Sequence, residues 1–106
     1  MALARGNLAF GQLADSNGLI YAPSSAVGLV HNILLHNTAA TVETVIITYD
    51  DGSNEYQLYE MGLAANETVQ LEFGGEGFVV EDAGDIKGET TTASTVTYKI
   101  DGTEET

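Results

Sequence analysis

The stretch VGLVHNILLHN, residues 27–37, and the stretch TVETVIITY, residues 41–49, decide the fold class of this chain. In the first stretch the odd positions run Val27, Leu29, His31, Ile33 and Leu35, and this period of two predicts a β-strand with that face inward. The even positions are only half polar, so we expect a central strand that is covered on both sides. The second stretch is rich in Thr, Val and Ile, which favour strands.

Further short strands follow, and turn residues separate them. Gly52 can adopt a positive φ, so the run DDGSN at residues 50–54 predicts a hairpin turn. The strands that we expect beyond it cover residues 55–60, 68–73, 78–80, 85–88 and 95–100, and residues 89–94 fit either a loop or an edge strand. Short strands with turns at intervals of roughly 8 to 12 residues predict an all-β fold, a β-sandwich or jelly roll of about seven or eight antiparallel strands.

The length of 106 residues fits a single domain with one core. Residues 1–17 are expected to form an extended N-terminal arm, because Gly6 and Gly11 interrupt their apolar positions. The sandwich domain is expected over residues 18–101, and residues 102–106 are expected to form a polar tail.

The chain is strongly acidic, with three Lys or Arg against sixteen Asp or Glu and a formal charge of −13. A surface of that sign repels phosphate backbones and anionic lipid headgroups, so we expect no direct binding of nucleic acid or membranes. The beginning of the sequence lacks the pattern of a secretory signal, which favours synthesis and retention in the cytoplasm of the producing cell. Cysteine is absent, so packing and backbone pairing must stabilise the fold.

The acidic residues are unevenly distributed. The first 42 residues contain one acid, Asp15, and one base, Arg5, whereas the other fifteen acids lie between Glu43 and Glu105. The front of the chain can therefore approach an acidic neighbour without strong repulsion.

Candidate metal ligands are present, but their spacing is poor. His31 and His36 are five residues apart in one predicted strand, which would place them on opposite faces and too far apart to share an ion. Two acidic clusters offer oxygen ligands suited to calcium: Asp50, Asp51, Asn54 and Glu55, and Glu81, Asp82 and Asp85. Neither has the spacing of an EF-hand loop, so solvated turns are the favoured interpretation and a weak calcium site is the alternative.

No set of residues predicts an enzyme. Paired carboxylates could serve glycoside hydrolysis, but the chain has no tryptophan for a sugar platform. Ser24 and Ser25 lack the context of an activated nucleophile. The glycines at 74, 75 and 77 do not lead into a helix, so they form no phosphate-binding loop. We therefore expect no catalytic residue and no cofactor.

As a whole, residues 21–105 resemble the small β-sandwich structural proteins of tailed bacteriophages. The shared features are the opening YAPSS at 21–25, the strand ending in HNTA at 36–39, the run LAANET at 63–68, the run AGDI at 83–86, a Thr/Ser/Ala-rich patch, and a closing strand at 96–100. Proteins of this kind serve as capsid decoration or cement proteins and as tail or head-to-tail junction components. They have no catalytic residues to transfer to this chain.

The resemblance implies a non-enzymatic virion protein, and a capsid decoration protein that binds the outer shell is the leading expectation. Its expected partners are the major capsid protein or other virion proteins and further copies of itself, with a trimer favoured. Arg5, Leu8 and Phe10 are the candidate interface residues, because they belong to the weakly charged front of the chain. A tail or junction component is the close alternative, and a carbohydrate-binding module is the alternative of a different class.

Overall fold

A computed structural model of the chain describes residues 3–23, 27–74, 77–81 and 83–105, and these residues form β-strands and connections without a helix. The strands in the described residues are β1 (Leu3–Gln12), β2 (Gly18–Tyr21), β3 (Val27–Asn37), β4 (Glu43–Asp50), β5 (Glu55–Leu63), β6 (Thr68–Glu72), β7 (Phe78–Val80), β8 (Asp85–Thr90) and β9 (Val96–Glu105). The described part of the chain accordingly contains no apolar helix of membrane-spanning length.

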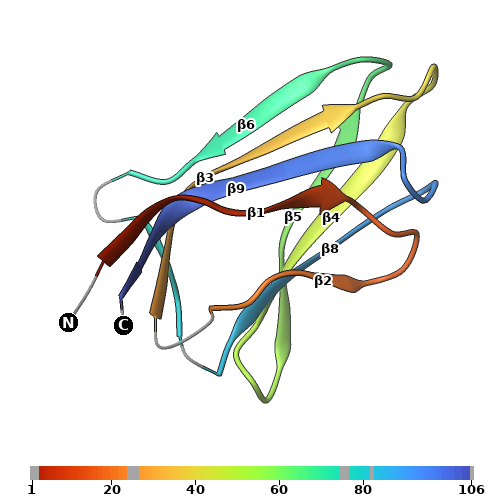
Figure 1. Cartoon of the computed structure of the whole chain (residues 1–106). Coiled ribbons are helices and arrows are strands. Elements are labelled where there is room, and N and C mark those ends of the chain that lie inside the picture. The colour runs from red at the N-terminus through yellow and green to blue at the C-terminus, as the bar shows by residue number, and fades with distance from the viewer. Residues whose placement is uncertain (1–2, 24–26, 75–76, 82, 106) are drawn as a thin grey trace.

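The strands form two antiparallel sheets, which Figure 1 shows as two layers. The first has the order β1-β9-β3-β6, and β7 also pairs with β3; the second has the order β2-β8-β4-β5. The all-β antiparallel fold is thus confirmed, although the described residues form nine strands instead of the seven or eight expected. Both sheets contribute to a single core of buried side chains: Leu13, Ile20, Tyr21, Val30, Ile33, Leu35, Val45, Ile47, Leu63, Val80, Ile86, Val96, Tyr98 and Ile100.

Strand β3 is central, as predicted, but its inward face changes partway along. Ile33 and Leu35 are buried as expected, whereas before them Val30 is buried and Leu29 is only half-buried. A β-bulge between Val30 and Asn32, in the pairing with β9, is the cause, because one extra residue shifts the alternation by one position. The prediction that all odd positions of this strand point inward is therefore wrong for its first half.

The two ends of the chain differ from the expected arm and tail. Residues 3–12 form β1, which pairs with β9 from Leu3 opposite Glu105 to Gln12 opposite Thr97. Residues 102–105 are the end of β9 and also pair with β3. Gly11 does not interrupt the strand: a Cβ there would lie 3.2 Å from the Tyr98 hydroxyl, so the glycine makes room for that ring.

Two buried polar side chains hold the connections at one end of the sandwich. The Asn37 amide nitrogen donates hydrogen bonds to the carbonyls of Thr41, Leu63 and Ala64, and its oxygen accepts one from the Ala39 amide. These bonds join the β3–β4 connection to the end of β5 and to the connection that follows it. Asn37 has no exposed surface, so the contacts are made without competition from water.

Glu43 is the second such residue, and its side chain is 3% exposed. Its Oε1 accepts hydrogen bonds from the Thr92 amide at 2.8 Å and from the Thr95 hydroxyl at 3.0 Å. Burial opposes ionisation, but these donors outweigh it and lower the pKa of the Glu43 carboxyl below its ordinary value. The carboxylate therefore organises the Thr/Ser-rich segment between β8 and β9.

Candidate functional site

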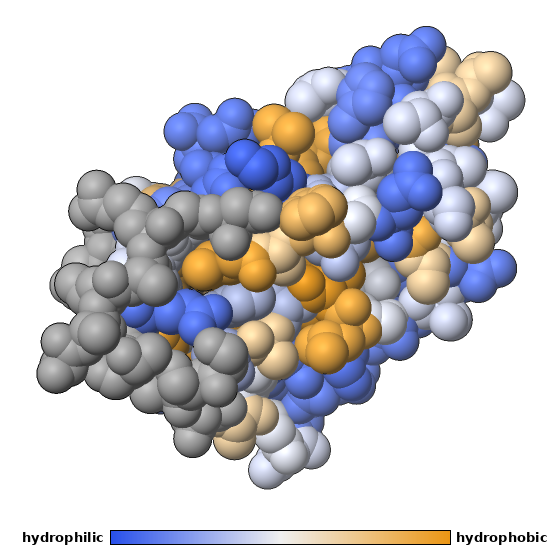
Figure 2. Space-filling view, in the orientation of Figure 1, coloured by the Kyte–Doolittle hydropathy of each residue, from blue (hydrophilic) through white to orange (hydrophobic). Residues whose placement is uncertain are grey.

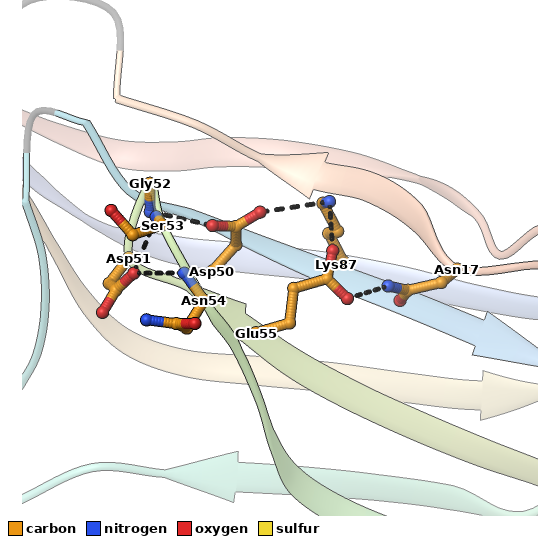
Figure 3. A network of polar contacts seen from close by, with 8 residues as sticks. All are labelled: Asn17, Asp50, Asp51, Gly52, Ser53, Asn54, Glu55 and Lys87. Atoms are coloured by element: carbon orange, nitrogen blue, oxygen red, sulfur yellow. Dashed lines mark hydrogen bonds and ion pairs between the residues drawn. The ribbon is translucent and has the colours of Figure 1, made fainter.

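The first acidic cluster is a turn that is held by its own carboxylates (Figure 3). Asp50 accepts a hydrogen bond from the Gly52 amide at 2.8 Å, and Asp51 accepts bonds from the amides of Ser53 and Asn54, also at 2.8 Å. The bonds from Asn54 and Ser53 hold the pKa of Asp51 below its ordinary value. Gly52 has a φ of 97°, the left-handed region that the sequence predicted for this glycine.

Lys87 of β8 lies beside this turn and supplies the positive charge (Figure 3). Its Nζ is 2.7 Å from Glu55 Oε2 and 3.2 Å from Asp50 Oδ2, and Asn17 donates to the other Glu55 oxygen at 3.0 Å. The hydrogen bonds to Glu55 and Asp50 raise the pKa of Lys87, while those from Gly52 and Lys87 lower the pKa of Asp50. A lysine thus sits among the oxygens that the sequence offered as calcium ligands.

Asp85 lies next to this turn, because its Cα pairs with that of Asp50 across β8 and β4. Its Oδ1 is buried and accepts no hydrogen bond. Burial, with the nearby Asp50 charge, raises the pKa of the Asp85 carboxyl. Of its partners in the second predicted cluster, Glu81 is exposed and Asp82 lies outside the described residues. Nowhere in the described ranges do three His, Asp or Glu side chains gather closely enough to hold a metal ion.

Each histidine bonds to a threonine on a neighbouring strand. His31 Nε2 is 3.3 Å from Thr103 Oγ1, and His36 Nδ1 is 2.7 Å from Thr68 Oγ1. The bulge at residue 31 removes the strict alternation from which we expected the two rings on opposite faces. The hydrogen bonds to Thr103 and Thr68 give both rings a structural role. Ser24, Ser25 and Gly75, which belong to the nucleophile and phosphate-loop motifs that the sequence does not support, lie outside the described residues.

The predicted interface residues Arg5, Leu8 and Phe10 all belong to β1 but differ in their surroundings. Phe10 is 73% exposed, whereas Leu8 is partly buried and packs against the core. The Cα of Arg5 pairs with that of Thr103, and its side chain is outside the description. Of the three, Phe10 is thus the side chain that is shown to be available to a partner.

Leu19 of β2 is a second exposed apolar side chain, and sequence reasoning missed it. It is 60% exposed. Strands β1 and β2 are edge strands of their respective sheets, and Figure 2 shows hydrophobic surface gathered where these strands cross the face in view. We refer to residues 8–21, which contain both exposed side chains, as the β1–β2 edge. Exposed apolar side chains on two edge strands indicate a surface of this kind. To find that pattern in the sequence, one must already know that residues 3–12 form a strand.

The β1–β2 edge also has a distinct charge. Asp15 is the only Asp, Glu, Lys or Arg within residues 8–21. Lys99 is the strand partner of Phe10, and Lys87 is the strand partner of Leu19, so two of the three basic residues of the chain adjoin this edge. The β1–β2 edge therefore carries less negative charge than the acid-rich segment after residue 42, and its exposed apolar side chains suit contact with another protein.

Comparisons of the chain with protein-family models, with curated proteins and with solved structures give no match.

Proposed function

We propose that the chain is a jelly roll that serves as a non-enzymatic structural protein of a bacteriophage virion, as a decoration or cement protein on the outer capsid shell. The observation that carries the jelly-roll part of this proposal is the nested pairing of the strands. β1 pairs with β9, β2 with β8, β3 with both β6 and β7, and β4 with β5. The first strand thus pairs with the last, the second with the one before the last, and so on to the hairpin of β4 and β5 in the middle of the sequence.

Strands β6 and β7 count as one interrupted strand in this interpretation. Both pair with β3, β6 along residues 32–36 and β7 along residues 28–30. With these two combined there are eight strands in two sheets of four, the number that a jelly roll has. Jelly rolls occur in viral capsid proteins, in lectins and in cupins. The fold alone does not distinguish these functions, so the function has to be argued from the surface residues.

The surface favours attachment to other proteins. A cupin or an enzyme would need metal ligands or a catalytic set, and the acidic turn that comes nearest contains Lys87 bonded to Asp50 and Glu55. The β1–β2 edge instead offers exposed Phe10 and Leu19 with little charge. An acidic exterior is compatible with the outside of a DNA-filled shell, where no contact with DNA is required. Many copies at symmetric positions bind strongly through avidity even if each contact is weak.

Quantitative mass spectrometry of purified phage particles tests the proposal. A decoration protein is expected in a copy number close to that of the major capsid protein or a simple fraction of it. A copy number matching one tail or one head-to-tail junction would support that alternative position. Absence of the chain from particles would refute the virion function.

Carbohydrate binding, the alternative of a different class, is tested separately. Thermal shifts with a glycan panel, with calcium and with EDTA are expected to leave the melting temperature of the chain unchanged. A specific glycan that raises the melting temperature would contradict the proposal and favour a lectin-like module, because ligand binding to the folded state stabilises it.

A further inference from the structure

The outer edge of β1 carries backbone groups that no strand of the described chain uses. The Leu13 amide donates to the Val96 carbonyl at 2.9 Å, and Gln12 pairs with Thr97 in the preceding position. In an antiparallel ladder, successive residues point their backbone groups alternately toward and away from the partner strand. The N–H and C=O groups of Phe10 and Gln12 therefore point away from β9, toward the open edge.

Residues 9–12 of this edge lack the features that usually protect an edge strand from pairing with another chain. Proteins commonly place lysine, proline, a bulge or a covering loop there. Residues 9–12 of β1 read AFGQ, with no charge and no proline, and Phe10 is 73% exposed. One bulge is present, between Asn7 and Ala9, and it leaves residues 9–12 as the regular part of the edge.

The outward N–H and C=O groups of Phe10 and Gln12 are self-complementary about a twofold axis, so the occupant of this edge is a second copy of the chain that approaches with the same edge. Each copy carries a formal charge of −13, so two copies repel each other over most of their surfaces. The far edges are unsuitable, because β5 contains Glu55 and Glu60 and β6 contains Glu72. Contact between two β1 edges brings no acid of one strand against an acid of the other, since Arg5 is the only charged residue of β1.

We infer that two copies associate by antiparallel pairing of their β1 edges about a twofold axis, which extends the first sheet from one copy into the next. A register centred on Gly11 places Phe10 of each copy opposite Gln12 of the other. That register uses the outward N–H and C=O groups of both residues in both copies, which is strand addition of the kind seen in many protein complexes. The inference does not rest on the proposed virion function, and it replaces the expected trimer by a dimer.

Sedimentation equilibrium of the purified chain over a wide concentration range tests the inference. The expected result is a reversible dimer of twice the 11.2 kDa chain mass. Gln12→Pro removes an outward N–H and should be tolerated at a strand edge, whereas Phe10→Asp adds a charge at the contact. Each substitution is expected to weaken the dimer about tenfold or more, which corresponds to about 1.4 kcal/mol.

Val79→Asp is the matched control, because Val79 is an exposed apolar residue on β7, away from β1, and is 45% exposed. The control should dimerise like the wild-type chain, and circular dichroism should show that every variant keeps its strand content. Raising the salt concentration should strengthen the dimer, because it screens the repulsion between acidic copies. A wild-type chain that stays monomeric, or an oligomer that both Phe10→Asp and Gln12→Pro leave intact, would overturn the inference.

Discussion

Replacement of Asn37 by aspartate is expected to destabilise the fold strongly. The Asn37 amide nitrogen lies 2.9, 3.0 and 3.1 Å from the carbonyl oxygens of Thr41, Leu63 and Ala64. Aspartate has nearly the same shape, but its carboxylate cannot donate a hydrogen bond and would face these three oxygens with a negative charge. The variant therefore loses both N–H donors at a site without exposed surface.

The magnitude follows from the groups left without partners. A buried carbonyl that loses its donor costs about 1–3 kcal/mol, and an uncompensated buried charge costs about 3–5 kcal/mol. These two costs are not added together, because the aspartate can avoid the buried charge by taking up a proton, which also restores one donor. We therefore expect a loss of about 3–5 kcal/mol in the free energy of unfolding at neutral pH. Typical domains have a total stability of about 5–15 kcal/mol.

Urea denaturation followed by circular dichroism and by tyrosine fluorescence measures this loss. Asn54→Asp is the matched control, because it adds the same charge on an exposed turn, and its effect should stay within about 0.5 kcal/mol. Lowering the pH should reduce the difference between Asn37→Asp and the wild-type chain as the new carboxyl protonates. An Asn37→Asp variant within about 0.5 kcal/mol of the wild type would refute the role assigned to this amide.

Three further substitutions test other parts of the structure. The pKa of Glu43 is lowered in the folded state, so its ionised form stabilises the fold above its unfolded pKa. That contribution is lost as the pH falls through the folded pKa. Glu43→Gln should therefore unfold more easily at pH 7, and its melting temperature should depend less on acidification. The pKa of Asp85 is raised, so ionisation costs stability at neutral pH, and Asp85→Asn should raise the melting temperature at pH 7 with a gain that shrinks on acidification. Gly28→Ala would place a Cβ in conflict with the Tyr21 ring and its hydroxyl and should cost about 1–3 kcal/mol in urea denaturation, whereas Gly62→Ala, whose Cβ would lie 3.7 Å from its nearest neighbour, should be nearly neutral.

The sequence predicted the fold class because aliphatic and β-branched residues alternate over several short segments. Residues 27–37 and 78–80 were predicted with the bounds of β3 and β7. The bulge in β3 could not be predicted, because Leu29 and Val30 are both aliphatic and either could face the core. Only the pairing with β9 decides between them.

The ends of the chain were misjudged for a related reason. Glycine weakens a strand by itself, so Gly11 indicated an irregular arm. In the structure this glycine provides room beside Tyr98, nearly ninety residues away, and such a tertiary contact is invisible in a local pattern. Phe10 was nevertheless identified as a candidate interface residue from the weak charge of the N-terminal segment, and it is exposed.

The burial and bonding of polar side chains could not be predicted from the local sequence either. Nothing in the sequence distinguishes Glu43 from the other acids of the chain, yet it is bonded within the Thr-rich segment at residues 90–95. Threonines are common in edge strands and loops, and nothing in their order indicates that they surround a carboxylate. The same holds for Lys87, whose position among Asp50 and Glu55 depends on β8 pairing with β4.

Rebinding of the purified chain to phage particles assembled without it tests the proposed decoration function most directly. We expect saturable binding over the whole outer shell, visible by cryo-electron microscopy, with weaker binding for Leu19→Asp than for the control Val79→Asp. Particles that bind no chain, although they lack it and have an intact shell, would contradict the proposed decoration function.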